Sequence, residues 1–288
     1  MNSSKIKNFL IILLAAVNVF LLINLFVARS QNSQLSGDAL EASAQALARS
    51  GIYIEAKNIP SQKHTQKVIC ANSFTHTRLD TAKVVLGEIL AEYSLPDGIT
   101  YQSEDAYVSF FDSGRFEYGL LATRDESAAF LSPEPPEKMD KITSSVSKKL
   151  KKAFEKFTKN RASNEIGYVE LGMIKSNEKD VVFAQLLVDS LVLHDSNFVA
   201  VFENDTLTYF CGKYFFDSFE DYYTKEYIDA PNALFLLKNK SGSVKRIEMV
   251  YYPAASTSSE YFLIPSWQIT LGDGTIKIFD GVSGYERR

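Results

Sequence analysis

The sequence is poor in the residues that build metal and redox sites. Its 288 residues include three histidines and two cysteines. The histidines, His64, His76 and His194, are far apart, and neither an HExxH motif nor a paired CxxC motif is present. Metal sites in proteins usually draw three or four such ligands from closely spaced positions. We therefore expect no metal ion and no cofactor.

Motifs of covalent catalysis and of phosphate binding are missing as well. No G-x-S-x-G or S-x-x-K signature stands in a strand–turn–helix setting, and there is no glycine-rich phosphate loop. The densest acidic cluster is Asp217, Glu220 and Asp221, which lacks the ligand spacing of a calcium loop and is typical of the start of a helix. The sequence thus predicts no catalytic residues and a protein that is not an enzyme.

The two cysteines lie 141 positions apart, at Cys70 and Cys211. In an oxidising compartment they could form a disulfide, but strand-like residues flank each of them and buried single thiols are common. Two separate buried thiols are the favoured interpretation, and the sequence leaves pairing open.

The composition is that of a folded protein with an acidic surface. The net charge is −4, hydrophobic residues make up 45% and aromatic residues 12%. This is enough apolar material for one large or two modest domains. An acidic balance without clustered positive charge argues against binding of nucleic acid.

A single long hydrophobic run stands near the beginning, at residues 9–27. It holds 19 residues without a charge, which at about 1.5 Å per residue is long enough to span a bilayer. Lys5 and Lys7 precede it, which favours a cytoplasmic N-terminus. A signal peptide cleaved near residues 28–30 is the alternative. We expect a retained transmembrane anchor, a single-pass protein of the cell membrane, and an extracellular ectodomain.

Two amides interrupt this hydrophobic run, at Asn18 and Asn24. An amide within a membrane is costly unless it finds a hydrogen-bonding partner. Asn18 and Asn24 are therefore the candidate partner-binding residues, with Asn18 the better placed of the two because it is nearer the middle.

A proline cluster at residues 133–136 is the clearest break in the remaining chain, since it fits neither a helix nor a central strand. It predicts a domain boundary. The expected organisation is a cytoplasmic start, an anchor, a spacer with a helix, an N-terminal α+β domain and a C-terminal α+β domain, at residues 1–8, 9–27, 28–51, 52–131 and 137–288.

Hydrophobic periodicity predicts four helices, over residues 38–49, 79–93, 139–157 and 229–237, and Asp217 to Glu220 resembles a fifth helix start. The third helix carries six lysines: Lys148, Lys149, Lys151, Lys152, Lys156 and Lys159. A solvated lysine face is the simplest interpretation. Contact with an anionic envelope polymer or with lipid headgroups is the alternative.

Three segments share a pattern of alternating strand, short polar turn and second strand: VSFFDSGRFEYG, VAVFENDTLTYF and WQITLGDGTIKI. They predict three hairpins. The fold class expected from these patterns is α+β, with an N-terminal transmembrane helix followed by antiparallel β-sheets that carry helices on one face.

Both ends of the chain resemble the YycI regulatory proteins of Gram-positive bacteria. At the start, an asparagine-containing hydrophobic span is followed by SGIYIEAKNIP. At the end, YFLIPSWQITLGDGTIKIFDGVSG is similar to the last strands of YycI, YycH and related PepSY-type units. The family-motif positions are Pro265, Trp267, Gly274 and Gly284, which we expect to be structural.

The resemblance implies a protein without enzymatic activity that binds a sensor histidine kinase, WalK or YycG, together with a YycH-like protein. Its function would be to modulate a two-component system that controls cell-wall homeostasis. An envelope carrier for an apolar molecule and, less favoured, a cell-wall polymer enzyme are the alternatives.

Overall fold

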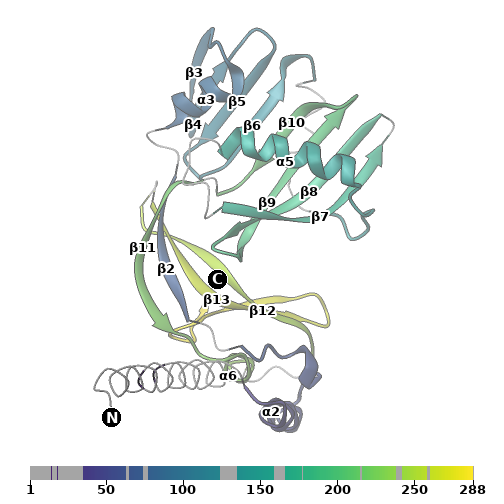
Figure 1. The fold of residues 1–288 in the computed structure, drawn as a ribbon, viewed down its shortest axis with the longest axis vertical. Helices are drawn as coiled ribbons and strands as arrows, with labels where there is room; N and C mark the ends of the chain where they lie inside the picture. Colours follow the sequence, from purple (N-terminus) through teal and green to yellow (C-terminus); the bar gives the residue numbers. More distant parts are fainter. Residues whose placement is uncertain are drawn as a thin grey trace, which may run out of the picture. The chain divides into compact units, whose positions relative to one another are not determined.

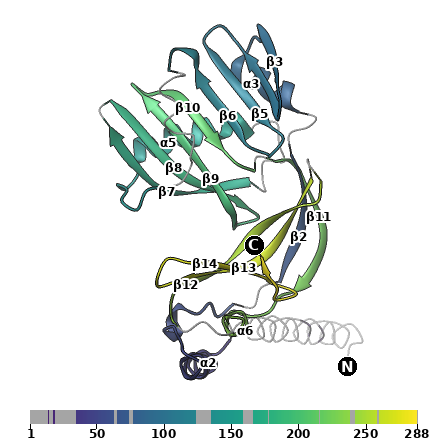
Figure 2. The ribbon, with the colours of Figure 1, turned by 180° about the vertical axis from the view of Figure 1, so that it is seen from behind.

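The computed structural model describes Leu14, Asn18 and residues 35–62, 65–73, 77–123, 135–158, 166–176, 178–214, 216–237, 242–257 and 260–287. Its elements are drawn in Figure 1 and, from behind, in Figure 2. The chain divides into two compact units. The first comprises the residues up to Gln66, Glu226–Glu248 and Trp267–Arg288, and the second comprises Lys67–Lys225 and Met249–Ser266.

The second unit is built mainly of antiparallel strands, with alternating or continuous apolar residues that fit a sheet with a buried face. The strand order is β11-β2-β13-β12-β9-β10-β6-β5-β4-β3, and β8 joins β7 to β9. The bounds are β2 Thr65–Ser73, β3 Ala91–Leu95, β4 Gly98–Gln102, β5 Ala106–Phe111, β6 Phe116–Leu120, β7 Ile166–Ser176, β8 Lys179–Val188, β9 Leu191–Glu203, β10 Thr206–Gly212, β11 Phe216–Glu226, β12 Gly242–Ala255 and β13 Glu260–Leu271.

Two helices belong to the second unit, α3 (Arg78–Leu86) and α5 (Ser144–Thr158), and a 3₁₀ turn follows β6 at Leu121–Thr123. The buried side chains of α5 join one cluster with those of the strands, and Figures 1 and 2 show this helix on one face of β6, β10, β9 and β8. Aromatic rings of α5 pack against rings of the strands, with the stacked rings of Phe157 and Phe210 4.5 Å apart between centroids. Aromatic burial of this kind is the main driving force for seating α5.

The first unit holds helices α2 (Gly37–Arg49) and α6 (Ala230–Phe235), a 3₁₀ turn at Ala56–Asn58, strands β1 (Ile52–Tyr53), β14 (Ile276–Asp280) and β15 (Glu286–Arg287), and the remaining parts of β12 and β13. Asp229 caps α6, the helix expected over residues 229–237, because its carboxylate accepts a hydrogen bond of 2.9 Å from the backbone N–H of Asn232.

The three predicted hairpins are confirmed as β5–β6, β9–β10 and β13–β14. Their turns need left-handed backbone conformations, which Gly114 and Gly274 adopt with φ of 78° and 87°. The β9–β10 turn instead uses Asn204 and Asp205, with φ of 46° and 67°. Asn and Asp are the non-glycine residues that best tolerate the left-handed backbone region. Short turns rich in Asp, Asn and Gly were therefore a valid basis for predicting hairpins.

The predicted fold class is wrong. Most of the described chain forms one mixed sheet of fifteen strands rather than antiparallel sheets carrying helices on one face. Two pairings are parallel, β1 with β12 and β12 with β9. Such pairings join segments far apart in the sequence, and local periodicity carries no information about them. Within the described ranges, no helix has both the length and the apolar character needed to cross a membrane.

Two predicted helices are corrected. The helix expected over residues 79–93 ends at Leu86, because Gly87 at its C-terminal end adopts φ 82°, and residues 91–95 form β3. The helix start expected at Asp217 is part of strand β11, which pairs with β2. Residues on both sides of the predicted domain boundary, 52–131 and 137–288, contribute to the second unit.

The hydrophobic run at residues 9–27 lies outside the described residues except for Leu14 and Asn18. Asn18 is helical and exposed. Asn24 is not described, so the partner-binding role of these two amides stays a prediction.

Candidate functional site

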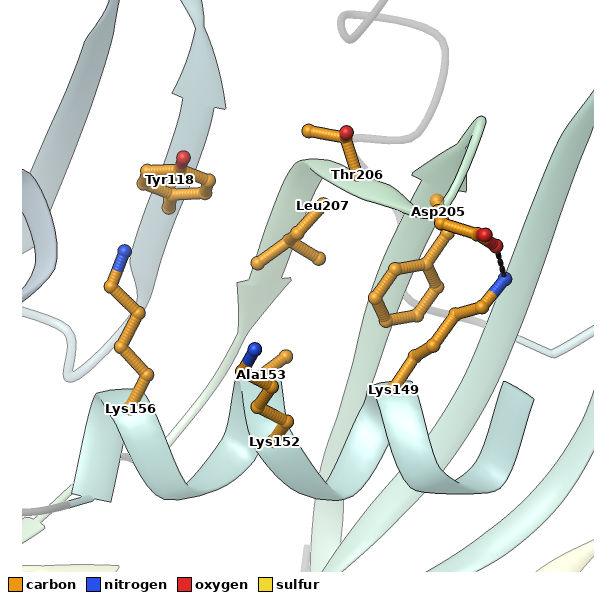
Figure 3. Close-up of a pocket in the computed structure, with 9 residues that line it drawn as sticks. Tyr118, Lys149, Lys152, Ala153, Lys156, Asp205, Thr206 and Leu207 are labelled. Carbon is orange, nitrogen blue, oxygen red and sulfur yellow. Dashed lines mark ion pairs between the residues drawn. The ribbon is translucent and has the colours of Figure 1, made fainter. Parts of the chain in front are cut away.

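A groove in the second unit lies between α5 and the strands beside it. It has a volume of about 360 Å³, within the range of about 300–1,000 Å³ typical of small-molecule sites. Figure 3 shows the lysines of α5 on one side and residues of β6 and the β9–β10 hairpin on the other. The lining residues are Tyr118, Lys149, Lys152, Ala153, Lys156, Phe202, Asp205, Thr206 and Leu207.

The sequence of α5 explains why lysines line this groove. Val146, Leu150 and Phe157 recur at helical spacing and are buried against the sheet. Lys149, Lys152 and Lys156 are spaced by three and four residues, so they follow one another along a single side of the helix. The groove is therefore bordered by a row of ammonium groups.

Lys149 is the lysine whose charge is balanced. Its ammonium group forms an ion pair with Asp205, drawn as a dashed line in Figure 3, and lies 3.9 Å from the carboxylate of Asp180. The same ammonium lies 6.0 Å from the centre of the Phe202 ring. Asp205 sits in the β9–β10 turn with its side chain 83% exposed, so this end of the groove is closed by a surface carboxylate rather than a buried one.

Lys156 and Lys152 differ from Lys149 in their electrostatic surroundings. The Lys156 ammonium lies 5.9 Å from the centre of the Tyr118 ring, toward which it points in Figure 3. Burial lowers the pKa of Lys156 from its ordinary value. In the part of the chain that the structure describes, neither Lys152 nor Lys156 has a carboxylate within ion-pair distance. Among the described residues, the charges of Lys152 and Lys156 are thus not balanced by an ion pair.

The surroundings of this pair add an aromatic and aliphatic surface to the positive charge. Tyr118 is buried, and burial raises the pKa of its phenol, so the phenol is neutral at ordinary pH. Thr206 contributes an exposed hydroxyl and Leu207 an aliphatic side chain. An arrangement of this kind can bind a negatively charged ligand, because such a ligand restores the charge balance that partial burial disturbs.

The site differs from what the sequence singled out. The sequence identified the lysines of this helix but did not separate those at the groove from the others. Lys148 and Lys151 are not among the residues that line the groove, and the ammonium of Lys151 lies 3.8 Å from the carboxylate of Glu155 on the same helix. Lys159 lies outside the described residues. Only the spacing of Lys149, Lys152 and Lys156 beside a buried apolar stripe could have indicated the groove.

None of the four family-motif residues is among the described residues that line the groove. The buried indole of Trp267 donates a hydrogen bond of 2.8 Å to the carbonyl oxygen of Ile228. Gly284 adopts φ 70°, and a Cβ there would lie 3.2 Å from Leu236. Pro265 lies in β13, which has β2, β12 and β14 as neighbours.

Neither cysteine belongs to the groove, and the two form no disulfide. Both thiols are buried, as predicted. Burial and a hydrogen bond of 3.2 Å to the carboxylate of Glu260 raise the pKa of Cys70 to about 11. Among the described residues, no group of three or more His, Cys, Asp or Glu side chains is placed to hold a metal ion.

No family model matches this chain, and neither does any curated protein. Among solved structures, it is similar to an uncharacterized protein from Eubacterium rectale, with 11% identity, coverage of 82% of this chain and 89% of the other, and a TM-score of 0.46. It is also similar to the C-terminal domain of YpeB from Bacillus megaterium, with 12% identity, 76% and 97% coverage and a TM-score of 0.37. Both likenesses are distant, and membership of the YycI family stays a prediction.

Proposed function

We propose that this chain is a binding protein without catalytic activity, which takes a negatively charged ligand in the lysine groove of its second unit and acts in regulation outside the cytoplasm. The observation that carries the ligand part is the pair Lys152 and Lys156, whose charges have no carboxylate partner among the residues described. Burial of the Lys156 ammonium without a counter-ion among the described residues is a cost to the folded protein, and an anion in the groove offsets it.

The residues that line the groove also indicate which kind of ligand it binds. An apolar molecule would leave the ammonium groups of Lys152 and Lys156 desolvated and unpaired, which is unfavourable. An anionic ligand meets the same groups with favourable Coulomb attraction, and the adjoining aromatic surface lowers the local dielectric and strengthens that attraction. We therefore favour an anion over the apolar cargo that a carrier would hold.

For the regulated partner, we propose a sensor histidine kinase of the WalK or YycG kind, with a YycH-like protein in the same assembly. This proposal rests on the sequence motifs at the two ends of the chain. Regulation would proceed by population shift, in which the chain binds one conformation of the kinase more tightly and couples to it with about 1–3 kcal/mol.

The ligand part is tested by titrating the full chain with inorganic phosphate and following binding by calorimetry and by NMR of the lysine side chains. We expect saturable binding that shifts the signals of Lys152 and Lys156. The double variant Lys152→Gln/Lys156→Gln should lose most of the affinity. The control is Lys148→Gln/Lys151→Gln, which removes the same charge from the same helix but leaves the groove intact.

Equal losses in the groove variant and in the control would show that phosphate responds only to overall charge and would refute the groove as a site. The partner part is tested separately by crosslinking the full-length protein in its native envelope. Recovery of a sensor histidine kinase supports the regulatory role. A reproducible set of crosslinked partners that contains no such kinase would contradict it.

A further inference from the structure

We propose that the ligand of the lysine groove is a linear phosphodiester chain, whose successive phosphates meet Lys156, Lys152 and finally Lys149, and that Asp205 competes with the ligand for Lys149. This inference rests on the proposed function and deepens it, because it names the class of ligand and the residue that controls its binding.

The spacing of the lysines favours a linear ligand over a single phosphate group. Along an α-helix, Lys152 and Lys156 are separated by about 6 Å and Lys149 and Lys152 by about 4.5 Å. The ammonium groups of Lys149 and Lys156 lie at opposite ends of the row, the first at Asp205 and the second near the Tyr118 ring, so one small anion would have to draw both away from these neighbours to contact all three. A chain with regularly repeated charges can contact all three, and each further contact then forms at a high effective concentration.

The surface beside the lysines matches the parts of such a chain that carry no charge. Tyr118, Phe202 and Leu207 present ring and aliphatic surface along the groove. A phosphodiester chain has carbon linkers between its charges, and these linkers need apolar surface to lie against. The row of lysines on α5 and the apolar surface that faces it therefore fit a chain that carries both phosphates and carbon linkers.

The choice of lysine favours phosphate over carboxylate. Among the described residues, no arginine lines the groove. A planar carboxylate is best recognised by the planar fork of a guanidinium group, which offers two parallel hydrogen bonds. A tetrahedral phosphate accepts hydrogen bonds from many directions, which suits an ammonium group that acts as a point charge with three rotatable donors.

Asp205 occupies one end of the row in the way that a ligand phosphate would. Its carboxylate pairs with Lys149, although its side chain is 83% exposed and stands on a surface turn. An ion pair with a solvent-exposed carboxylate adds little stability, so a ligand can displace Asp205. Lys149 retains Asp180 at 3.9 Å and is not left without a partner when Asp205 moves away.

The test compares two probes with the full chain, glycerol 3-phosphate and a tetramer of glycerol phosphate. We expect the tetramer to bind about tenfold tighter or more, since its additional phosphates form contacts within an existing complex. The tetramer should also show the steeper dependence on salt concentration, because more charge pairs form when it binds.

Two variants locate the additional contacts. Lys149→Gln should remove much of the advantage of the tetramer and leave the affinity for the monomer nearly unchanged. Asp205→Asn should strengthen tetramer binding severalfold by releasing Lys149, again with little effect on the monomer. Thermal unfolding of each variant confirms that the groove is still folded, and Glu155→Gln, which alters an exposed carboxylate elsewhere on α5, is the matched control.

The outcomes separate this inference from the proposed function. Equal affinity for monomer and tetramer overturns the linear ligand while the groove remains an anion site, whereas no binding of either probe overturns both. Equal binding of poly-glutamate of similar length overturns the phosphodiester assignment. Binding to vesicles that contain phosphatidylglycerol, without binding of the free tetramer, assigns the phosphate to lipid headgroups and overturns the polymer.

Discussion

The carboxylate of Asp280 should account for a measurable part of the stability of the first unit. It is nearly buried and accepts hydrogen bonds from the backbone N–H groups of Val282 (2.8 Å) and Ser283 (2.7 Å), and it pairs with the guanidinium of Arg287. Burial alone would raise the pKa of Asp280. The two backbone hydrogen bonds and the arginine outweigh burial, so the pKa is lowered from its ordinary value.

The perturbation is Asp280→Asn, which keeps the shape and one acceptor oxygen but removes the charge. Hydrogen bonds to a charged group contribute about 1.5–3 kcal/mol each, and neutral ones about 1 kcal/mol. Because Arg287 is partly exposed, its share is reduced by solvent screening. We expect the variant to lose about 2 kcal/mol of the free energy of unfolding at pH 7.

The assay is urea unfolding followed by tryptophan fluorescence, since Trp267 is the sole tryptophan and is buried in the same unit as Asp280. A group with a lowered pKa in the folded state stabilises above its unfolded pKa, about 3.9 for Asp, and this contribution is lost as the pH falls through the folded pKa. The difference between wild type and Asp280→Asn should therefore be constant above about pH 5 and shrink below about pH 4.

The control is Glu286→Gln, which removes an exposed carboxylate that pairs with Lys277 in the same unit. A surface ion pair contributes at most about 1 kcal/mol, so this variant should lose less than Asp280→Asn. A pH 7 loss for Asp280→Asn no larger than that of the control, or one that persists undiminished in acid, would refute the reasoning from charge.

Three further predictions concern buried groups. Trp267→Phe should cost about 1–3 kcal/mol, measured by circular dichroism during urea unfolding, because it leaves the carbonyl of Ile228 without the indole donor; a loss below 0.5 kcal/mol would contradict this. Leu150→Ala should lower the free energy of unfolding by about 2–5 kcal/mol, since Leu150 is fully buried on α5; a neutral result would mean that α5 is not part of the core. Cys70 should react slowly with iodoacetamide at pH 8, because its pKa is about 11, and Glu260→Gln should lower that pKa and speed the reaction, as measured by peptide mass spectrometry; an unchanged rate would contradict the role of Glu260.

Local patterns predicted the elements whose stability is local. The helix over Gly37–Arg49, the cap at Asp229 and the hairpin β5–β6 all follow from neighbouring residues, and all are present. In each case the capping side chain, the turn residues and the apolar face lie within one short segment. Propensity, capping and burial then favour the same structure.

The wrong predictions concern segments whose secondary structure depends on pairing with other strands. Residues 79–93 carry a helical apolar stripe, yet Gly87 ends the helix, and residues 91–95 pair with β4 with Tyr93 exposed. Asp217 to Glu220 fits a capping pattern, but pairing with β2, about 150 positions earlier, makes this segment a strand. Cross-strand pairing can override local propensity, and a single sequence does not reveal the partner strand.

The sequence indicated only some of the residues that line the groove. The lysines of α5 were noted, but the residues that make them a site come from β6 and from the β9–β10 turn. Tyr118 stands 38 positions before Lys156 and Asp205 stands 56 positions after Lys149. The charged and aromatic residues could be counted from the sequence. The ion pair between Lys149 and Asp205 and the desolvation of Lys156, in contrast, depend on tertiary packing.

The division of the chain has a consequence for biosynthesis and for protein engineering. The first unit takes strands and helices from three separate stretches, and the last of them begins at Trp267. During translation this unit therefore stays incomplete until the final segment leaves the ribosome, while most of the second unit has already been made. Neither unit is a contiguous piece of the gene, so dissecting this protein requires a circular permutation or a grafted linker rather than a simple truncation.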